Sequence, residues 1–296
     1  ALMPGAGGEI GRALTAHPGI DGVAFTGGTE TAWAINRTLA ARDGPIIPFI
    51  AETGGLNAMF VDTTALAEQV VDDVIVSAFG SAGQRCSAMR LLFIPHDSAD
   101  ELITSIKGAM DALVIGDPSQ PETDIGPVID ADAKKLLEAH VAHLAATATM
   151  LHRCLLDPSL GPGHWFAPTL AEISGVDYLA GEVFGPILHI IRYSPSELKA
   201  VAATLAAKRY GLTLGIHSRI DGFAREVQGL VPAGNVYINR SMVGAVVGVQ
   251  PFGGEGLSGT GPKAGGPHAL FRFATEHVVS DNIAARGGDP ALLSLG

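Results

Sequence analysis

The sequence predicts an α/β protein built around a parallel sheet. Short apolar runs of strand length alternate with segments of helical periodicity along most of the 296 residues, an order typical of strands joined by helical crossovers. Hydrophobic residues make up 47% of the chain and charged residues 17%, and the mean hydropathy is +0.30. This composition is typical of a well-buried globular chain and excludes intrinsic disorder.

Each element is placed by an apolar run or by a helical periodicity. We expect strands at residues 22–25, 46–51, 58–61, 90–94, 187–193, 213–217 and 235–239. Helices are predicted at residues 9–17, 30–42, 65–79, 99–113, 131–146, 196–207 and 222–230. Thr29, Asp97 with Ser98, and Asp221 stand where helix N-caps are expected. Residues 268–280 are predicted to form a final extended segment.

Glycine is the most telling residue type. The chain has 38 glycines and 18 prolines without a collagen period, which indicates many tight loops. Glycines cluster at residues 54–55, 80–83 and 244–266. The last stretch is too rich in glycine for a regular element, so we expect an irregular loop that closes on a site.

The net charge of −11 argues against two classes of partner. Such a chain has no basic face to displace counterions from nucleic acid or to dock on an anionic membrane. The two cysteines exclude a secreted disulfide framework and favour a reducing compartment, so we expect a cytoplasmic location. No run reaches about 18 consecutive apolar residues, so no transmembrane segment is expected.

Cys86 is a candidate nucleophile. It lies in GQRCSA, residues 83–88, after a predicted helix and before a predicted strand. Small neighbours leave room for a substrate, and Arg85 is placed to favour the thiolate. The alternative is a buried, inert cysteine, which this stretch in isolation favours. Cys154 has no comparable loop and is interpreted as structural.

Glu52 is a candidate general base. It follows the apolar run 46–51 and precedes Thr53, Gly54 and Gly55, and the end of a buried strand is a suitable place for a base. A helix-cap or salt-bridge carboxylate is an equally good interpretation of these residues. Glu52 and Cys86 together indicate thiol chemistry with a carboxylate base.

A phosphate site is predicted at residues 25–29, FTGGT, where a strand ends and a helix begins. Backbone amides and the helix dipole bind anions at such a turn. Residues 5–11, GAGGEIG, look like a dinucleotide fingerprint, but no strand precedes them and the spacing differs. We therefore expect no phosphate loop there.

Metal chemistry has little support in the sequence. His140 and His143 stand three residues apart on a predicted helix, but no third ligand follows, so solvated histidines are favoured. None of the 10 histidines has the context of a protease catalytic group. We expect no metal.

Five motifs in order resemble the aldehyde dehydrogenase superfamily. They are FTGGT (25–29), ETGG (52–55), GQRC (83–86), EVFGP (182–186) and PFGG (251–254). The runs at 239–261 and 284–293 resemble more narrowly the glutamate semialdehyde dehydrogenase module of the bifunctional proline utilization A flavoenzymes. The resemblance implies NAD-dependent oxidation of L-glutamate 5-semialdehyde to L-glutamate, the second step of proline catabolism.

The resemblance also implies catalytic and cofactor-binding roles. Cys86 attacks the aldehyde to give a thiohemiacetal that loses hydride and becomes a thioester, and Glu52 activates the water that hydrolyses it. The cofactor contacts implied are Thr26, Gly27, Gly28, Gly54, Glu182 and Phe184. Among these, Glu182 matches the residue that binds the nicotinamide ribose, and many relatives have serine where Gly28 stands.

Four substrate contacts are implied as well. Ser87, Gly244 and Ala245 match positions that bind the α-carboxylate, where exposed backbone amides can bind an anion without a charged side chain. Phe252 matches a residue that lines the aliphatic part of the substrate.

The resemblance predicts the back part of a longer enzyme. Residues 1–51 match the C-terminal part of a Rossmann-like NAD-binding domain, residues 52–266 a catalytic domain, and residues 267–296 an oligomerisation strand with a C-terminal tail. FAD is expected only in a proline dehydrogenase module upstream. Because the oxyanion asparagine of the family lies on an earlier segment, we expect the fragment alone to be nearly inactive. A homo-oligomer, most simply a dimer, is expected, with peripheral membrane association possible for the full enzyme.

Two other functions stay open from the sequence. One is an aldehyde dehydrogenase with a different substrate. The other is a non-catalytic aldehyde-dehydrogenase-like assembly domain, although the presence of both Cys86 and Glu52 counts against it.

Overall fold

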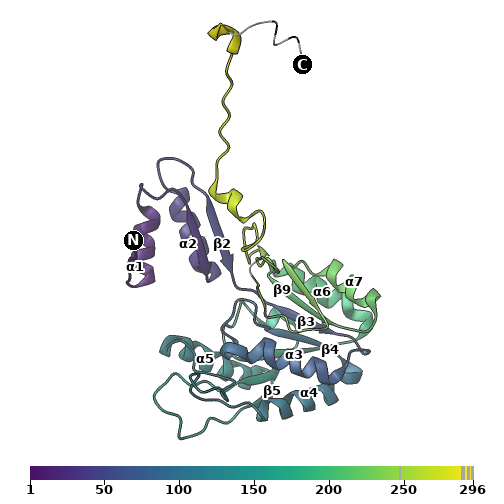
Figure 1. Cartoon of the computed structure of the whole chain (residues 1–296). Coiled ribbons are helices and arrows are strands. Elements are labelled where there is room, and N and C mark those ends of the chain that lie inside the picture. Colours follow the sequence, from purple (N-terminus) through teal and green to yellow (C-terminus); the bar gives the residue numbers. More distant parts are fainter. Residues whose placement is uncertain (247, 288–290, 292–293, 295–296) are drawn as a thin grey trace.

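The computed structural model describes residues 1–246, 248–287, 291 and 294 (Figure 1). Within these residues the α-helices are α1 (Gly7–Ala16), α2 (Thr29–Ala40), α3 (Ala67–Phe79), α4 (His96–Asp111), α5 (Ala131–Thr147), α6 (Leu198–Ala207) and α7 (Asp221–Leu230). The strands are β1 (Val23–Gly27), β2 (Phe49–Thr53), β3 (Ala58–Val61), β4 (Leu91–Pro95), β5 (Thr149–Arg153), β6 (Thr169–Glu172), β7 (Ile187–Tyr193), β8 (Tyr210–Gly211), β9 (Thr213–His217), β10 (Asn235–Ile238) and β11 (Glu255–Gly256). Short 3-10 helices lie at Gly80–Gly83, Val176–Tyr178, Pro195–Glu197, Ala269–Phe273 and Ile283–Arg286.

Seven strands form the main sheet, in the order β10-β9-β3-β4-β7-β6-β5. Neighbouring strands run parallel except β5, which is antiparallel to β6. Helices cover both faces: α3 packs against α4, and α6 packs against α7 (Figure 1). Every residue of β3, β4 and β9 is therefore buried, as apolar parallel strands require. Phe60 of β3 stacks on Phe93 of β4 with ring centroids 4.3 Å apart.

Strands β1 and β2 form a separate parallel pair, packed against α2. β2 leads through residues 54–57 directly into β3, so the carboxyl end of the small pair meets the amino end of the main sheet. Residues 258–260 run along the free edge of β2, where the amide of Thr53 donates to the carbonyl of Ser258 and the amide of Thr260 to that of Ala51, both at 2.9 Å. The glycine-rich stretch near the C-terminus thus joins the two sheets. The domain boundary predicted between residues 51 and 52 falls inside β2.

The predicted α/β class is confirmed, and most elements lie where the sequence places them. The strands at residues 58–61, 187–193 and 213–217 have the predicted bounds, and the other expected strands and helices begin and end within three residues of prediction. Strands β5 and β6 were not predicted. The first is a partly exposed edge strand of mixed polarity and the second has only four residues, so neither presents a clear apolar run.

The predicted helix caps are wrong. Helices α2, α4 and α7 begin at Thr29, His96 and Asp221, and none has a side-chain hydrogen bond at its cap. A side-chain cap does form at α5, where Oδ1 of Asp130 accepts a hydrogen bond from the amide of Ala133 at 2.7 Å. The predicted caps lie one to three residues after the observed N-caps Gly28, Pro95 and Ile220, which is too late in the chain for the N-cap position.

The extended segment predicted at residues 268–280 is only partly correct. Ala269–Phe273 form a 3-10 helix, and residues 274–280 have no helix or strand assignment. This second part runs away from the body of the molecule (Figure 1), with Val278 and Val279 84% and 76% exposed. Of the closing run at 284–293, residues 288–290 and 292–293 lie outside the described part of the chain.

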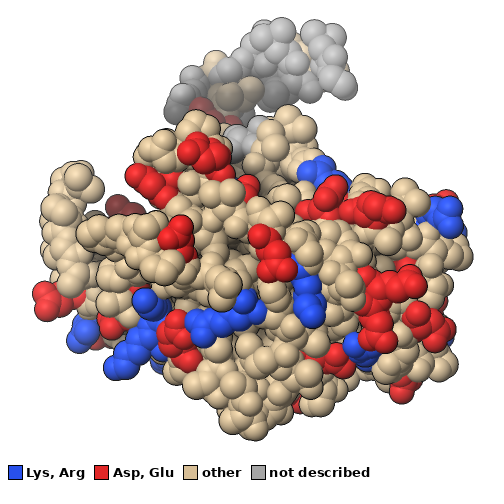
Figure 2. All heavy atoms as spheres, turned by 90° about the horizontal axis from the view of Figure 1, so that it is seen from below, with Lys and Arg blue, Asp and Glu red and all other residues tan. Residues whose placement is uncertain are grey.

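The described helices include none that is long and apolar enough to cross a bilayer. On the face shown in Figure 2, acidic and basic side chains are interspersed.

Candidate active site

The loop that carries Cys86 is held in a strained conformation. It follows α3 and the 3-10 helix Gly80–Gly83 and leads into β4. Ser81 and Ala82 have φ angles of 56° and 53°. This left-handed region costs a non-glycine residue about 1–2 kcal/mol. Gly83 follows with φ of 64°, and a Cβ there would overlap the carbonyl of Gly185. Such strain persists only where surrounding contacts enforce it, which is typical of functional loops.

Asn57, which immediately precedes β3, binds the backbone of the Cys86 loop. Its Nδ2 donates to the carbonyls of Cys86 at 2.6 Å and Ala88 at 2.9 Å, and its Oδ1 accepts from the amide of Thr213 at 3.2 Å. The side chain is almost fully buried, so all three bonds are shielded from water. Sequence analysis missed this residue, because its role appears only when β3, β4 and β9 are placed side by side.

The Cys86 thiol is partly buried and surrounded by acidic groups. Burial raises its pKa, and the charges of Glu182 and Glu52 raise it further, while the backbone amides of Ser87 and Cys86 lower it. The prediction that Arg85 favours the thiolate is wrong, because the Nε of Arg85 donates to Ser81 Oγ at 2.9 Å and the net pKa shift is upward. A thiol in this state needs a base to remove its proton.

Cys154 differs from Cys86 in its surroundings. It is buried, its Sγ donates to the carbonyl of Met110 at 3.4 Å, and burial with the nearby Asp111 raises its pKa to about 11. These properties fit the structural role expected for it.

Glu52 lies on β2 with its carboxylate against three glycines. Its Oε2 accepts a hydrogen bond from the amide of Gly254 at 2.9 Å, whereas Oε1 is buried without a hydrogen-bond partner among the described residues. A Cβ at Gly253 or Gly259 would lie 3.1 Å or 2.7 Å from a carboxylate oxygen. Burial raises the pKa of Glu52, opposed by the Gly254 amide and by the charge of Lys263. Neither the helix cap nor the salt bridge considered from the sequence forms within the described chain.

Glu182 is the second carboxylate at the site. Its Oε1 lies 3.0 Å from Nη2 of the fully buried Arg90. A Cβ at Gly54 would overlap the carboxylate of Glu182, so a larger residue there would displace that side chain. Burial raises the pKa of Glu182 despite the charge of Arg90. Phe184, 45% exposed, lies with its ring centroid 5.2 Å from the Arg90 guanidinium. The structure thus brings together Gly54, Glu182 and Phe184 from two distant motifs.

The turn predicted to bind phosphate has the expected geometry. Thr26 and Gly27 end β1, and Gly28 precedes the first turn of α2, whose backbone amides are unsatisfied by the helix itself. Thr26 pairs with Glu52 in the strand register, which places the turn beside the candidate base. Space around Gly28 is open, since a Cβ there would meet no atom within 4 Å. Residues 7 to 11 of the glycine-rich lookalike lie inside α1, as a helix rather than a phosphate loop.

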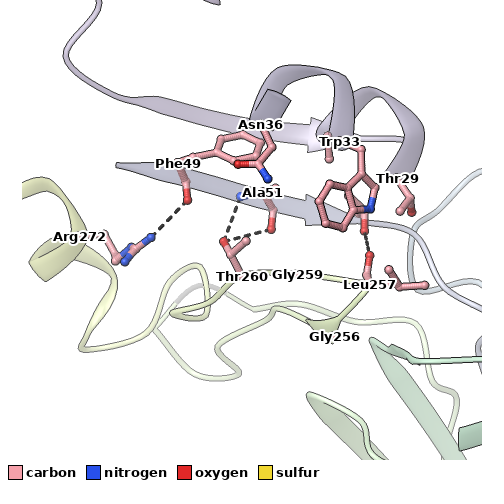
Figure 3. Close-up of a pocket in the computed structure, with 12 residues that line it drawn as sticks. Thr29, Trp33, Asn36, Phe49, Ala51, Gly256, Leu257, Gly259, Thr260 and Arg272 are labelled. Carbon is pink, nitrogen blue, oxygen red and sulfur yellow. Dashed lines mark hydrogen bonds between the residues drawn. The ribbon is translucent and has the colours of Figure 1, made fainter. Parts of the chain in front are cut away.

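A cavity of about 310 Å³ lies between α2, β2 and residues 256–260 (Figure 3). Phe49, Ala51 and Thr53 line it from alternate positions of β2. Because side chains alternate along a strand, Glu52 faces the other side of β2. Neither Glu52 nor Cys86 is among the residues that line this cavity.

Three of the four residues predicted to bind substrate lie near one of the two catalytic candidates: Ser87 and Gly244 near Cys86, and Phe252 near Glu52. Ser87 follows Cys86 and is buried. The carbonyl of Gly244 accepts from the hydroxyl of Tyr237 at 2.6 Å, and the pKa of Tyr237 is raised by burial and by the nearby Cys86. Phe252 pairs with Ala264 and directly precedes Gly253, which contacts Glu52. Ala245 is exposed beside Gly244.

Two further side chains at this loop were missed from the sequence. The guanidinium of Arg240 lies 5.4 Å from the ring centroid of Tyr237. A Cβ at Gly244 would lie 3.8 Å from its Nη2. A positive charge therefore accompanies the backbone amides that were expected to bind a carboxylate without one. The motif NRSMVGA contained the arginine, but its direction could not be read from the sequence.

The described residues contain no cluster of three or more His, Cys, Asp or Glu side chains arranged for a metal ion. His140 contacts His189, with 2.9 Å between their Nε2 atoms, rather than His143, which packs against Tyr178. His140 is thus half-buried and hydrogen-bonded, not solvated as expected.

Comparison with known proteins identifies relatives of this chain. The chain is 50% identical over 280 residues to the bifunctional protein PutA of Klebsiella aerogenes, covering 92% of this chain and 21% of that protein. It is 32% identical over 284 residues to 1-pyrroline-5-carboxylate dehydrogenase of Geobacillus thermodenitrificans, covering 94% and 54%. The chain thus spans about a fifth of the PutA relative and half of the dehydrogenase.

Solved structures give the same picture. A crystal structure of a bifunctional proline utilization A protein matches with a TM-score of 0.90 and 57% identity over 95% of this chain and 28% of that one. A 1-pyrroline-5-carboxylate dehydrogenase from Thermus with bound NAD matches with a TM-score of 0.83 and 32% identity over 92% and 52%. The sequence profile described as aldehyde dehydrogenase family matches residues 1–279. The chain belongs to the aldehyde dehydrogenase family.

Proposed function

We propose that this chain carries the catalytic groups of an enzyme that oxidises L-glutamate 5-semialdehyde to L-glutamate with NAD, the second step of proline catabolism, as part of a longer bifunctional polypeptide. The observation that carries the proposal is the placement of Cys86, Glu52 and Glu182 where the two sheets meet. Asn57, just before β3, donates to the carbonyl of Cys86 at 2.6 Å, and the Glu182 carboxylate packs against Gly54, two residues after Glu52. Beyond burial, both carboxylates raise the pKa of the thiol. The relatives named PutA and 1-pyrroline-5-carboxylate dehydrogenase support the substrate.

The residues present fit a dinucleotide. Thr26, Gly27 and Gly28 would bind the pyrophosphate through open backbone at the start of α2, where a Cβ on Gly28 meets nothing. Glu182 would bind the ribose next to the nicotinamide, with Gly54 leaving room for its carboxylate and the exposed Phe184 covering that end. When bound, NAD supplies the acceptor for the hydride that leaves the substrate carbon.

Cys86 and Glu52 divide the covalent chemistry between them. The thiol loses its proton to solvent, and Sγ bonds to the aldehyde carbon while the C=O π electrons become an oxyanion. The backbone amides of Cys86 and Ser87, which act on the thiol, would donate to that oxyanion. After oxidation, Glu52 takes a proton from a water that adds to the thioester carbon. The C–S bond then breaks, releasing glutamate and the thiol. The raised pKa of Glu52, caused by burial, suits a base that works near neutral pH.

The loop around Gly244 supports a carboxylate-bearing substrate. Tyr237 fixes the carbonyl of Gly244, so the neighbouring amides are oriented, and Arg240 adds a positive charge beside them. An aldehyde without a carboxylate could not form an ion pair with Arg240.

Assembly and the remaining cofactor follow the same relatives. We propose that residues 274–280, exposed at Val278 and Val279, pair with a second copy in a dimer, since an exposed extended segment needs a covering partner. FAD would belong to a proline dehydrogenase module elsewhere in the polypeptide. The two free thiols, Cys86 and Cys154, fit the reducing conditions of a cytoplasmic enzyme.

The test is NADH formation from glutamate semialdehyde by the native polypeptide that contains this chain. Cys86→Ala should reduce kcat by on the order of 10⁴-fold or more with an unchanged circular dichroism spectrum, because no other group can form the thioester. Cys154→Ala is the matched control and should keep its activity. Undiminished turnover by Cys86→Ala would rule the assignment out.

A second variant separates the proposed substrate from other aldehydes. Gly244→Val should displace Arg240 and raise the KM for glutamate semialdehyde far more than the KM for pentanal, which has no carboxylate. Equal losses on both substrates would favour an aldehyde dehydrogenase with another substrate. No turnover of any aldehyde would favour a non-catalytic assembly domain.

A further inference from the structure

Arg90, the residue just before β4, forms side-chain hydrogen bonds with both backbone carbonyls and a carboxylate. Its side chain is fully buried. Nη1 donates to the carbonyls of Gly83 at 2.7 Å and Gly185 at 3.2 Å. Nη2 donates to the carbonyl of Arg85 at 3.1 Å and, with Nε, to Oε1 of Glu182 at 3.0 Å and 3.3 Å.

These partners belong to two loops that are far apart in the sequence. Gly83 and Arg85 lie just before the nucleophile in the chain, whereas Glu182 and Gly185 belong to the loop that precedes β7. The planar fork of a guanidinium can serve four acceptors in fixed directions, which lysine cannot do. A charge buried this completely is tolerated only when paired and hydrogen-bonded throughout, so the two loops are coupled through this one side chain.

We propose that Arg90 is a positioning residue for the reaction: it holds the Glu182 carboxylate and the Cys86 loop in one arrangement, so that the cofactor-side carboxylate and the nucleophile move together. The proposal rests on the proposed function for the role of Glu182. It does not depend on the identity of the aldehyde.

The charge of Arg90 also bears on the thiol, through Glu182. Glu182 is the strongest charged group that raises the pKa of Cys86, after burial. Arg90 balances that carboxylate, and the Cys86 thiolate in turn favours the charged form of Arg90. Without Arg90, the negative charge of Glu182 would face the thiol uncompensated and make the thiolate harder to form.

A mutant cycle on NAD affinity tests the coupling to Glu182. Arg90→Met, Glu182→Gln and the double variant are made in the native polypeptide, and NAD binding is measured by calorimetry without substrate. A charged hydrogen-bonded contact is worth roughly tenfold to a hundredfold in affinity, so Arg90→Met should weaken binding by at least about tenfold. The double variant should match Glu182→Gln within about twofold, because Arg90 acts through Glu182. Fully additive losses would overturn the proposal.

The pH profile of thiol alkylation by iodoacetamide tests the Cys86 side, with no cofactor present. Arg90→Met should shift the midpoint of the profile to higher pH, and Arg90→Lys, which keeps the charge, should restore part of the shift. An unchanged midpoint in folded Arg90→Met would contradict the proposal. Because this assay uses neither NAD nor aldehyde, it stands even if the proposed function fails.

Folding is controlled in two ways. Arg90→Met leaves Glu182 buried without its partner, so if that variant does not fold, the double variant and Arg90→Lys carry both assays. Arg192→Met is the matched control, because Arg192, on β7 of the main sheet, is likewise an arginine in an ion pair, with Asp100 at 2.7 Å and Glu172 at 3.0 Å, but outside the site. It should leave NAD affinity and the alkylation midpoint unchanged; equal effects from Arg192→Met would show that any lost ion pair suffices and would refute a positioning role.

Discussion

The two sheets contribute opposite ends to the site, and they differ in how tightly they are packed. On the main-sheet side, the site lies at the amino ends of β3, β4 and β7. Every residue of β4 is buried, and a Cβ at Gly83 would overlap the carbonyl of Gly185. The small pair offers the carboxyl ends of β1 and β2, where no residue of β1 is buried and a Cβ at Gly28 meets nothing. The Cys86 loop is therefore fixed by dense contacts, whereas the phosphate turn depends on exposed backbone amides.

The largest effect is expected from Gly54→Ala, which is compared with Gly28→Ala in the open phosphate turn; each variant adds one methyl group. In Gly54→Ala the new Cβ would overlap the carboxylate of Glu182, so that side chain must move away from the cofactor position. We expect roughly a hundredfold loss in kcat/KM and about 1–3 kcal/mol lower unfolding free energy from overpacking. Gly28→Ala, on the open side, should change the unfolding free energy by less than about 1 kcal/mol. Steady-state kinetics and urea unfolding measure both, and equal responses would contradict the difference in packing.

Removing the Asn57 side chain, which binds the backbone of the Cys86 loop, should have the next largest effect. Asn57→Ala leaves the carbonyls of Cys86 and Ala88 and the amide of Thr213 without their partner in a buried place. Such unpaired groups cost about 1–3 kcal/mol, so unfolding in urea should occur at lower concentration and kcat should fall more than KM rises. Asn36→Ala, in the cavity on the far side of β2, is the control. A variant as stable and active as the parent would show that the loop is held by other contacts.

The dense packing around Cys86 also predicts a pH dependence. Burial, then the charges of Glu182 and Glu52, raise the pKa of the thiol, so the thiolate fraction grows as pH rises toward that pKa. Burial also raises the pKa of Glu52, so its basic form is lost as pH falls. Activity should therefore increase up to tenfold per pH unit on the acid side, with its midpoint above that of an ordinary carboxylate. Activity that is flat from pH 5 to about 9 would exclude this account.

The smallest expected effect is a gain in NAD affinity from Gly28→Ser, in the open phosphate turn. Gly28→Ser meets no atom, keeps an ordinary φ of −72°, and adds a hydroxyl at the N-cap of α2. A serine is a favourable N-cap and can also donate to a phosphate, so NAD should bind about threefold more tightly, a gain of under 1 kcal/mol. Calorimetry on the native polypeptide measures the NAD affinity. Weaker binding would contradict the prediction and indicate that bound NAD leaves no room for a side chain at residue 28.

Sequence analysis reached most elements of the main sheet because buried parallel strands such as β3, β7 and β9 are mainly apolar. It also selected Cys86, Glu52 and Glu182 as candidates, from motif order. What it could not reach depends on contacts between distant segments. Asn57 and Arg90 look like ordinary residues beside strands, and their roles exist only because β3, β4, β7 and β9 are neighbours. The expected effect of Arg85 failed for the same reason, since adjacency in the sequence did not place its charge at the thiol.

The division of labour between Cys86 and Glu52 is the central claim, and one measurement tests it most directly. The native polypeptide carrying Glu52→Gln is mixed rapidly with NAD and glutamate semialdehyde, and NADH absorbance is followed through the first turnover. Glutamine keeps the shape of the side chain but cannot accept a proton from water, so oxidation should proceed once and hydrolysis should stop. The account predicts a burst of one NADH per active site, with the acyl group found on Cys86 by mass spectrometry, followed by little turnover. Steady turnover without a burst, at a rate close to that of the parent enzyme, would contradict it.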